Sequence, residues 1–155
     1  MTDSASNCKA VTVKRTFSRQ TSISVHIHAD KSIIWGLLTN ASEYTRWNST
    51  IISIQGTIVK GGKIHLKSAL DPKRIFRLSI KEFDENHRLI WGDAMGKRVY
   101  LLTSIGNGET NFTMDEKIGG PLFPLFAKMI PSFDKSFEQF ASDLKDKAES
   151  IMKSK

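Results

Sequence analysis

Cysteine is almost absent from this chain, because Cys8 is the one thiol among 155 residues. A lone cysteine excludes an intrachain disulfide and makes the reducing cytoplasm the simplest expectation for the protein's location. A domain of this length buries roughly 70% of the surface that its unfolded chain exposes, so a packed core can hold the fold without cross-links. We therefore expect one domain that depends on its core.

Long apolar runs are missing as well. No stretch approaches the roughly 20 residues of a membrane-spanning helix, and the first residues lack the apolar centre of a secretory signal. Residues 1–17 are rich in Ser, Thr and basic side chains, which indicates a flexible N-terminal tail before a single domain at 18–155. An organellar transit peptide is the alternative for this tail. The sequence predicts no transmembrane segment and leaves transient membrane contact open.

Acidic residues are the minority: 16 Asp and Glu stand against 23 Lys and Arg, and the net charge is +7. Such a charge attracts nucleic acid or anionic lipid. The chain nevertheless has no run of five basic residues, no zinc-finger spacing and no glycine-rich phosphate loop, so we predict no nucleic-acid partner. A basic stripe on the outer face of one predicted hairpin leaves a protein-interaction module as a further hypothesis; it consists of His65, Lys67, Arg77 and Lys81.

Familiar catalytic and metal motifs are also lacking. The Ser, His and Asp residues come without a nucleophile elbow, so a hydrolytic triad is not supported. Of the four histidines, only His26 and His28 are close in sequence, and no Cys or carboxylate lies at a spacing that would supply a third ligand. The sequence thus predicts neither a metal site nor a cofactor.

The chain does contain a regular alternation of apolar and polar residues. This alternation makes Ser22 to His28 a half-buried strand with both histidines facing outward. Two short helices follow, one after Asp30 and a second that ends near Trp47. Gly-Gly and Asn-Gly turns then separate short apolar runs, the first with Ile52 on its inward face. These runs predict an antiparallel meander of six strands at 51–59, 63–69, 74–83, 89–93, 98–105 and 109–118.

The last third of the chain predicts a long helix. Apolar residues recur there at steps of three and four, which places them on one stripe: Phe126, Met129, Ile130, Phe133, Phe137, Phe140, Leu144, Ala148 and Ile151. Pro131 lacks a backbone donor and clashes with the preceding turn, so the helix should break there and leave 122–130 as a separate arm. A hinge at that point would let the arm act as a lid.

Three local sequences resemble one known family. Residues 42–48 (Ser-Glu-Tyr-Thr-Arg-Trp-Asn) are similar to the segment before the second strand in the polyketide cyclase/dehydrase-like (SRPBCC) branch of the START-like, birch-pollen-allergen-like helix-grip superfamily. Residues 107–116 and 118–122 resemble the last hairpin of that branch and the entry into its final helix. The resemblance implies an α+β fold. In it, a seven-stranded curved antiparallel sheet surrounds a long C-terminal helix, with two short helices after the first strand.

The resemblance also implies an apolar cavity between sheet and helix, which in this family often holds a lipid, a sterol or a polyketide. The chain departs from the branch at two positions. Ser49 replaces the proline that often follows Asn48, and Arg98 stands where many relatives have a histidine. The second departure argues against membership among the catalytic relatives.

Strand parity and the helical stripe give the residues expected to line such a cavity, with Trp47 and Asn48 near its mouth. The expected lining residues are Trp47, Asn48, Ile54, Leu66, Phe76, Leu78, Trp91, Tyr100, Leu102, Phe112, Met114, Phe126, Met129, Ile130, Phe133 and Phe137. Glu116, Arg98 and Tyr100 share the inward parity and are the catalytic candidates, because a carboxyl group in an apolar cavity can act as acid or base. The alternative for Glu116 is an ion pair with Arg98 at the cavity rim.

The leading hypothesis from the sequence is a non-enzymatic protein that binds or transports a hydrophobic small molecule of the lipid, sterol or polyketide-like kind. The alternative is a cyclase or dehydratase that uses Glu116 as acid or base, assisted by Arg98 or Tyr100. The interaction module described above is the third hypothesis. The sequence leaves the oligomeric state open.

Overall fold

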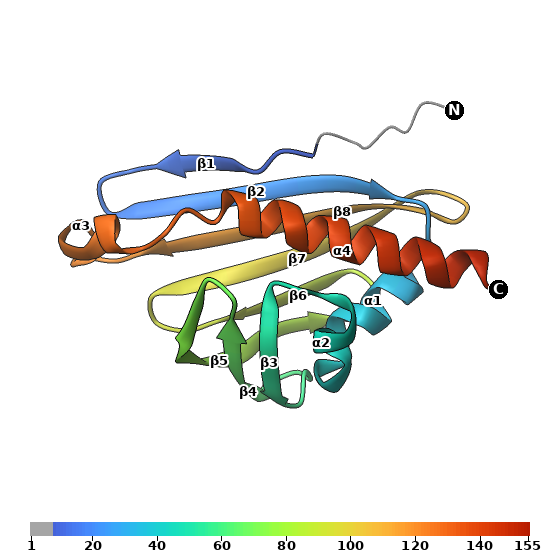
Figure 1. Ribbon diagram of the computed structural model, residues 1–155, viewed down its shortest axis with the longest axis horizontal. Coiled ribbons are helices and arrows are strands. Elements are labelled where there is room, and N and C mark those ends of the chain that lie inside the picture. The colour runs from blue at the N-terminus through green and yellow to red at the C-terminus, as the bar shows by residue number, and fades with distance from the viewer. Residues whose placement is uncertain (1–7) are drawn as a thin grey trace.

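A single antiparallel sheet curves around the long C-terminal helix in the computed structural model, which describes residues 8–155 (Figure 1). The strand order is β1-β2-β8-β7-β6-β5-β4-β3, so the last strand pairs with the second and the meander from β3 to β8 is unbroken. The α+β helix-grip architecture is confirmed, with eight strands in place of seven. The strands are β1 (Val11–Lys14), β2 (Ser18–Ile27), β3 (Ile51–Gly56), β4 (Lys63–Ser68), β5 (Asp71–Asp84), β6 (Arg88–Gly92), β7 (Gly96–Gly106) and β8 (Glu109–Gly119).

The additional strand, β1, lies inside the segment 1–17 that the sequence assigned to a flexible tail. It pairs over its whole length with the first half of β2. Val11 and Val13 are exposed at the edge of the sheet. The strand therefore buries no apolar face, and its polar, basic surroundings conceal it in the sequence. The tail prediction is wrong for 11–14, and residues 1–7 lie outside the described residues.

Two groups of helices are connected to this sheet. Between β2 and β3 lie α1 (Lys31–Thr39), the short turn η1 (Ala41–Glu43) and α2 (Tyr44–Trp47), which confirms the short helices expected after the first long strand. After β8 come α3 (Phe123–Phe126), η2 (Ala127–Met129) and α4 (Asp134–Lys153). The break predicted at Pro131 is confirmed, because residues 130–133 are not helical and separate α3 and η2 from α4.

The amphipathic pattern of α4 explains why this helix lies across the sheet (Figure 1). Its buried residues recur at steps of three and four, and they are Phe137, Phe140, Ala141, Leu144 and Ala148. They join the inward residues of the strands in one core cluster. Each fully buried phenylalanine contributes roughly 1.5–3 kcal/mol to stability. Within residues 8–155, no helix is both long enough and apolar enough to cross a membrane.

A bulge in β3 corrects the predicted inward face of that strand. The register with β4 shifts between Ile51 and Ser53. An extra residue in one strand reverses the side-chain parity on one side of the bulge. As a result, Ile51 and Ile54 are buried, whereas Ile52, which was expected to face inward, is 44% exposed. Simple alternation cannot reveal such a shift, since it depends on the pairing with β4.

Candidate ligand-binding cavity

The space between the sheet and α4 is filled at the end near α1 and α2. Phe140 lies at the centre of this filled end, with its ring centroid 5.7 Å from that of Tyr100 and 6.4 Å from that of Phe112. From α2, Trp47 and Tyr44 add two more rings, 5.8 and 6.4 Å from Phe140. The Tyr44 hydroxyl donates a hydrogen bond to the carbonyl of Leu38 at 2.8 Å, so its polar atom is satisfied inside the core.

The other end of the same space, near α3, contains a cavity of about 550 Å³. Its walls are formed by the strands β3 to β8, the arm 122–130, the non-helical hinge that follows it (residues 131–133) and Ser136 of α4. The apolar lining residues are Ile51, Leu66, Leu70, Phe76, Leu78, Trp91, Met95, Ile118, Phe126, Met129, Ile130, Pro131 and Phe133. A concave, mainly apolar space of this size is typical of small-molecule sites, which span about 300–1,000 Å³.

Half of the predicted lining residues lie on this cavity and half lie elsewhere. Those on the wall are Leu66, Phe76, Leu78, Trp91, Phe126, Met129, Ile130 and Phe133. The remaining eight belong to the buried part of the molecule outside the cavity wall, and they are Trp47, Asn48, Ile54, Tyr100, Leu102, Phe112, Met114 and Phe137. Inward parity is common to both sets, so it does not separate a filled core from a cavity wall. Ligand contact by any of these residues stays a prediction.

Trp47 and Asn48 do not lie at a cavity mouth. The Asn48 carboxamide oxygen accepts hydrogen bonds from the Thr50 backbone at 3.1 Å and the Thr50 hydroxyl at 2.6 Å. The Asn48 side-chain nitrogen donates to the carbonyl of Phe140 at 3.4 Å, and thereby joins the start of β3 to α4. Asn48 is thus held by these hydrogen bonds, and Trp47 beside it packs against Phe140.

The catalytic candidates meet where the cavity borders the filled end. Arg98 on β7 and Glu116 on β8 are directly opposite in register, and Arg98 Nε donates to Glu116 Oε1 at 2.8 Å. Both side chains line the cavity and are 16% exposed. Arg98 Nη1 also donates to the Tyr100 hydroxyl at 3.4 Å, and the guanidinium carbon lies 5.0 Å from the Phe137 ring centroid. The pairing places an ion pair in the cavity wall.

Burial and the neighbouring groups shift the pKa values of Arg98 and Tyr100 in opposite directions. Burial alone lowers the pKa of Arg98, but the Glu116 carboxylate and the Tyr100 hydroxyl outweigh it and raise that pKa above its usual value. Burial raises the pKa of Tyr100 to about 12, and the neighbouring Arg98 charge offsets only part of this. Arg98 is therefore a permanent cation and Tyr100 a neutral hydroxyl. A catalytic role for these residues stays a prediction.

Arg19, which the sequence did not single out, contacts residues of the cavity wall without lining the cavity itself. From β2, its Nη1 and Nη2 donate to the carbonyls of Ile130 at 3.2 Å and Pro131 at 2.7 Å, and its guanidinium lies 4.7 Å from the Phe133 ring centroid. Burial lowers the pKa of Arg19, while the charges of Glu116 and Asp134 oppose that effect. The signal in the sequence is its inward parity with Thr21 and Ile23, which a basic residue rarely has by chance. Arg19 fixes the hinge of the arm.

The arm itself carries apolar side chains that face solvent. Leu122 and Leu125 are strongly exposed, whereas Phe123 is buried and Phe126 lines the cavity. Met129 borders the cavity and is also exposed to solvent. The arm thus has one face toward the cavity and one face toward solvent.

No protein-family model matches the sequence, and no curated protein matches it significantly. Solved structures resemble the chain in fold. A START superfamily protein from Mycobacterium smegmatis aligns with a TM-score of 0.63 at 15% identity, over 85% of this chain and 98% of that one. CalU16 from Micromonospora echinospora aligns with a TM-score of 0.55 at 15% identity, over 95% of this chain and 96% of that one.

StfQ, a di-domain ARO/CYC protein of the steffimycin biosynthetic pathway, also aligns with this chain. Its TM-score is 0.63 at 10% identity, over 85% of this chain and 45% of StfQ. Identities this low establish the fold alone. The chain therefore has a START-like (SRPBCC-like) helix-grip fold, as the resemblance of its sequence predicted.

Proposed function

We propose that this protein binds or carries a hydrophobic small molecule with an uncharged polar group, such as a lipid, a sterol or a polyketide-like compound. The observation that carries this proposal is the cavity of about 550 Å³, whose mainly apolar wall holds one fixed Arg98–Glu116 pair. Apolar surface gives such a site its affinity, and a few placed polar groups fix the orientation of the ligand. The START-like fold of the chain agrees with this proposal.

The charges on the cavity wall favour a ligand without net charge. The wall holds three basic and three acidic residues, namely Arg74, Lys97 and Arg98 against Asp71, Asp93 and Glu116. A ligand carboxylate would meet about as much repulsion as attraction in this balanced set. A hydroxyl group can instead donate to the Glu116 carboxylate, and a hydroxyl or carbonyl oxygen can accept from the Arg98 guanidinium. The polar end of the ligand is therefore expected beside this pair.

The arm provides the route by which a ligand enters. Phe126 and Met129 close the cavity from the side of the arm, and Arg19 holds the hinge that follows them. Release of the two hydrogen bonds from Arg19 would free the arm without disturbing the packed end around Phe140. Ligand exchange is thus expected to depend on Arg19, while ligand affinity depends on the cavity wall.

A cyclase or dehydratase is the second candidate, because Glu116, Arg98 and Tyr100 form one connected group at the cavity wall. In this arrangement Arg98 already donates to Glu116, so the pair is suited to orienting a carbonyl as well as to moving a proton. The two functions differ in their response to Glu116→Gln. An enzyme loses turnover of a polyketide-like substrate and keeps its affinity, whereas a carrier loses at most some affinity.

Neighbouring residues of the arm offer a matched test of the binding function. Phe126 lines the cavity, and Leu125 beside it is 75% exposed and is not part of the wall. With Nile red as a neutral apolar probe, Phe126→Asp should weaken binding more than about tenfold, because a charge then enters the apolar site. Leu125→Asp should bind within about twofold of the original chain. Equal binding by both variants, each shown by circular dichroism to be folded, would refute the proposal.

A further inference from the structure

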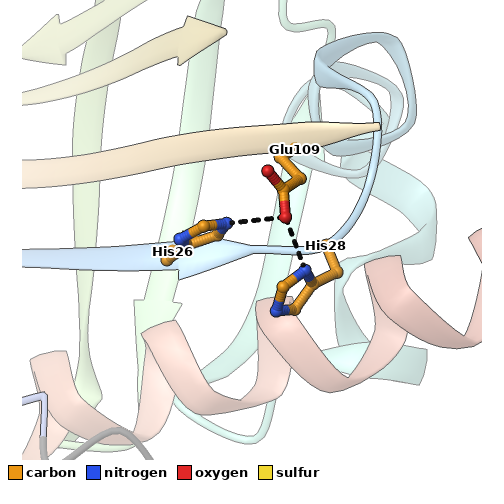
Figure 2. A group of neighbouring side chains, drawn as sticks. All are labelled: His26, His28 and Glu109. Atoms are coloured by element: carbon orange, nitrogen blue, oxygen red, sulfur yellow. Dashed lines mark ion pairs between the residues drawn. The ribbon is translucent and has the colours of Figure 1, made fainter. Parts of the chain in front are cut away.

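Two histidines and a glutamate come together on the outer face of the sheet, at the end opposite α3 (Figures 1 and 2). His28 Nδ1 lies 3.2 Å from Glu109 Oε1, and His26 Nε2 lies 3.6 Å from the same oxygen. One potential ligand atom from each residue lies within 4.8 Å of the others. Figure 2 shows the Glu109 carboxylate between the two imidazole rings. Both imidazole rings thus contact the same carboxylate oxygen.

The sheet explains why these residues meet. Alternation along β2 puts His26 and His28 on the same outward face. Ile27 pairs with Thr110, so Glu109, the first residue of β8, lies next to His28 across the two strands. A sequence search for ligands near the histidines misses Glu109, because the third ligand comes from the last hairpin and only strand pairing brings it close.

The backbone that carries the histidines is held in place by α4. Lys145 Nζ donates to the carbonyl of His26 at 3.0 Å, and the His28 backbone N–H donates to Glu149 Oε2 at 2.8 Å. Lys145 and Glu149 also pair with each other at 2.6 Å, so their charges largely offset one another beside the cluster. The C-terminal end of β2 is therefore held in place, and the Glu109 carboxylate supplies the negative charge of the cluster. Such support is what preorganises a set of metal ligands.

Two of the three spacings between the ligand atoms fit a tetrahedral metal ion, and the third, between the two histidine nitrogens, is at most 4.8 Å. Zinc binds imidazole nitrogen and carboxylate oxygen at about 2.0–2.2 Å, which puts neighbouring ligand atoms of a tetrahedron roughly 3.3–3.6 Å apart. The distances from Glu109 Oε1 to His28 Nδ1 and His26 Nε2, 3.2 and 3.6 Å, lie close to this range. Two imidazoles and one carboxylate suit Zn²⁺, whereas Mg²⁺ and Ca²⁺ prefer sites made of oxygen ligands.

We propose that His26, His28 and Glu109 form a binding site for a divalent metal ion of the zinc class, with its fourth position open. Glu109 also lines a polar hollow of about 290 Å³, which contains Asp30, Lys31 and Ser32 at the start of α1. The His26 and His28 side chains are 46% and 63% exposed, which leaves room for a water molecule at the open position. Three protein ligands with one free position define a site that can bind a further ligand.

The metal site is separate from the cavity. Glu109 and Glu116 lie seven positions apart on β8, which at about 3.3 Å per residue is roughly 23 Å. Metal binding and the proposed ligand binding can therefore be tested independently of each other. Phe126→Asp, which damages the cavity, should leave the affinity for Zn²⁺ unchanged, so failure of one proposal does not entail failure of the other.

The test is titration of the full chain with ZnCl₂ in competition with a chromophoric zinc indicator. We expect one Zn²⁺ per chain, and a loss of at least about tenfold in affinity for each of His26→Ala, His28→Ala and Glu109→Gln. His87→Ala is the matched control, because His87 Nδ1 pairs with Asp84 at 2.7 Å on the surface without a second histidine. This control should bind Zn²⁺ as the original chain does.

Substitution with Co²⁺ gives a second readout that does not depend on any variant. A four-coordinate site shows intense visible absorption, and MgCl₂ or CaCl₂ in excess should not displace the cobalt. The proposal is overturned if Zn²⁺ binds no more tightly than about 1 mM, a level at which binding by scattered surface histidines is expected. It is equally overturned if His87→Ala loses as much affinity as His28→Ala.

Discussion

The two ends of the space beside α4 share the curved sheet but are filled differently. Near α1 and α2, the rings of Tyr44, Tyr100 and Phe112 surround Phe140. Near α3, the same sheet and helix leave a cavity of about 550 Å³. The filled end receives side chains from the short helices after β2, whereas the open end lies beneath an arm that leaves the helix at Pro131. In this protein, the short connecting segments determine whether the curved sheet encloses a core or a ligand site.

The largest effect should come from the filled end. Phe140→Ala should lower the free energy of unfolding by about 3–5 kcal/mol, because it removes a fully buried ring and leaves a void. Phe76→Ala, on the half-buried wall of the cavity, should cost about 1 kcal/mol. Urea denaturation measures both. Equal losses would show that the two ends do not differ in packing.

The ion pair at the border between the two ends gives the next effect. Glu116→Gln should cost roughly 2 kcal/mol, since it leaves the Arg98 guanidinium, 16% exposed, without its partner. Glu82→Gln is the matched control, because Glu82 pairs with Arg88 at 3.4 Å on the exposed surface and should cost less than about 0.5 kcal/mol. If both substitutions cost the same in urea denaturation, the Arg98–Glu116 pair is not shielded from solvent.

Arg19→Met tests the hinge of the open end. Loss of the hydrogen bonds to the Ile130 and Pro131 carbonyls should favour the open arm by about 1.4 kcal/mol, a tenfold change in its population. Limited trypsin digestion after the exposed Lys128 should therefore be about tenfold faster.

Arg46→Met is the control for the hinge, because Arg46 forms an exposed pair with Glu43 far from the arm. It should leave the cleavage rate at Lys128 unchanged. An unchanged rate in Arg19→Met as well would mean that Arg19 does not restrain the arm.

The smallest effect concerns the titration of the two tyrosine side chains in the filled end. Tyr44 and Tyr100 are the chain's two tyrosines; burial raises the pKa of Tyr44 well above its ordinary value and that of Tyr100 to about 12. A pKa raised by folding adds stability that is fully present below the unfolded pKa near 10 and is lost as the pH rises toward 12. Phenolate absorbance should therefore stay low up to about pH 11 and then appear together with unfolding. Titration of either tyrosine near pH 10 in the folded protein would contradict its burial.

Local patterns in the sequence predict much of this fold. Alternation gives the strands of the meander, and Pro131 gives the break between the arm and α4. The strand β1 and the shift at Ile51 were not predictable from alternation, because one has no buried face and the other depends on the register with β4. Of the residues predicted to line the cavity, half lie on its wall, because alternation alone does not separate a cavity wall from a filled core. Parity identifies inward residues, but only the packing of Tyr44 and Trp47 decides which of them remain free to line a cavity.

Long-range contacts account for the rest of what the sequence could not provide. Arg19 meets the hinge, and Glu109 meets His26 and His28, across separations in the chain that no local pattern spans. Such contacts follow from strand pairing and from the position of α4. They become visible only once the whole sheet is assembled.

Native mass spectrometry of the purified chain, compared with its denatured mass and followed by extraction of whatever is released, tests the ligand-binding cavity most directly. We predict a stoichiometric, uncharged apolar passenger, which is retained by Leu125→Asp and lost from Phe126→Asp. A chain that is empty on purification, and stays empty after exposure to a library of lipids, sterols and polyketide-like compounds, would contradict the proposed function.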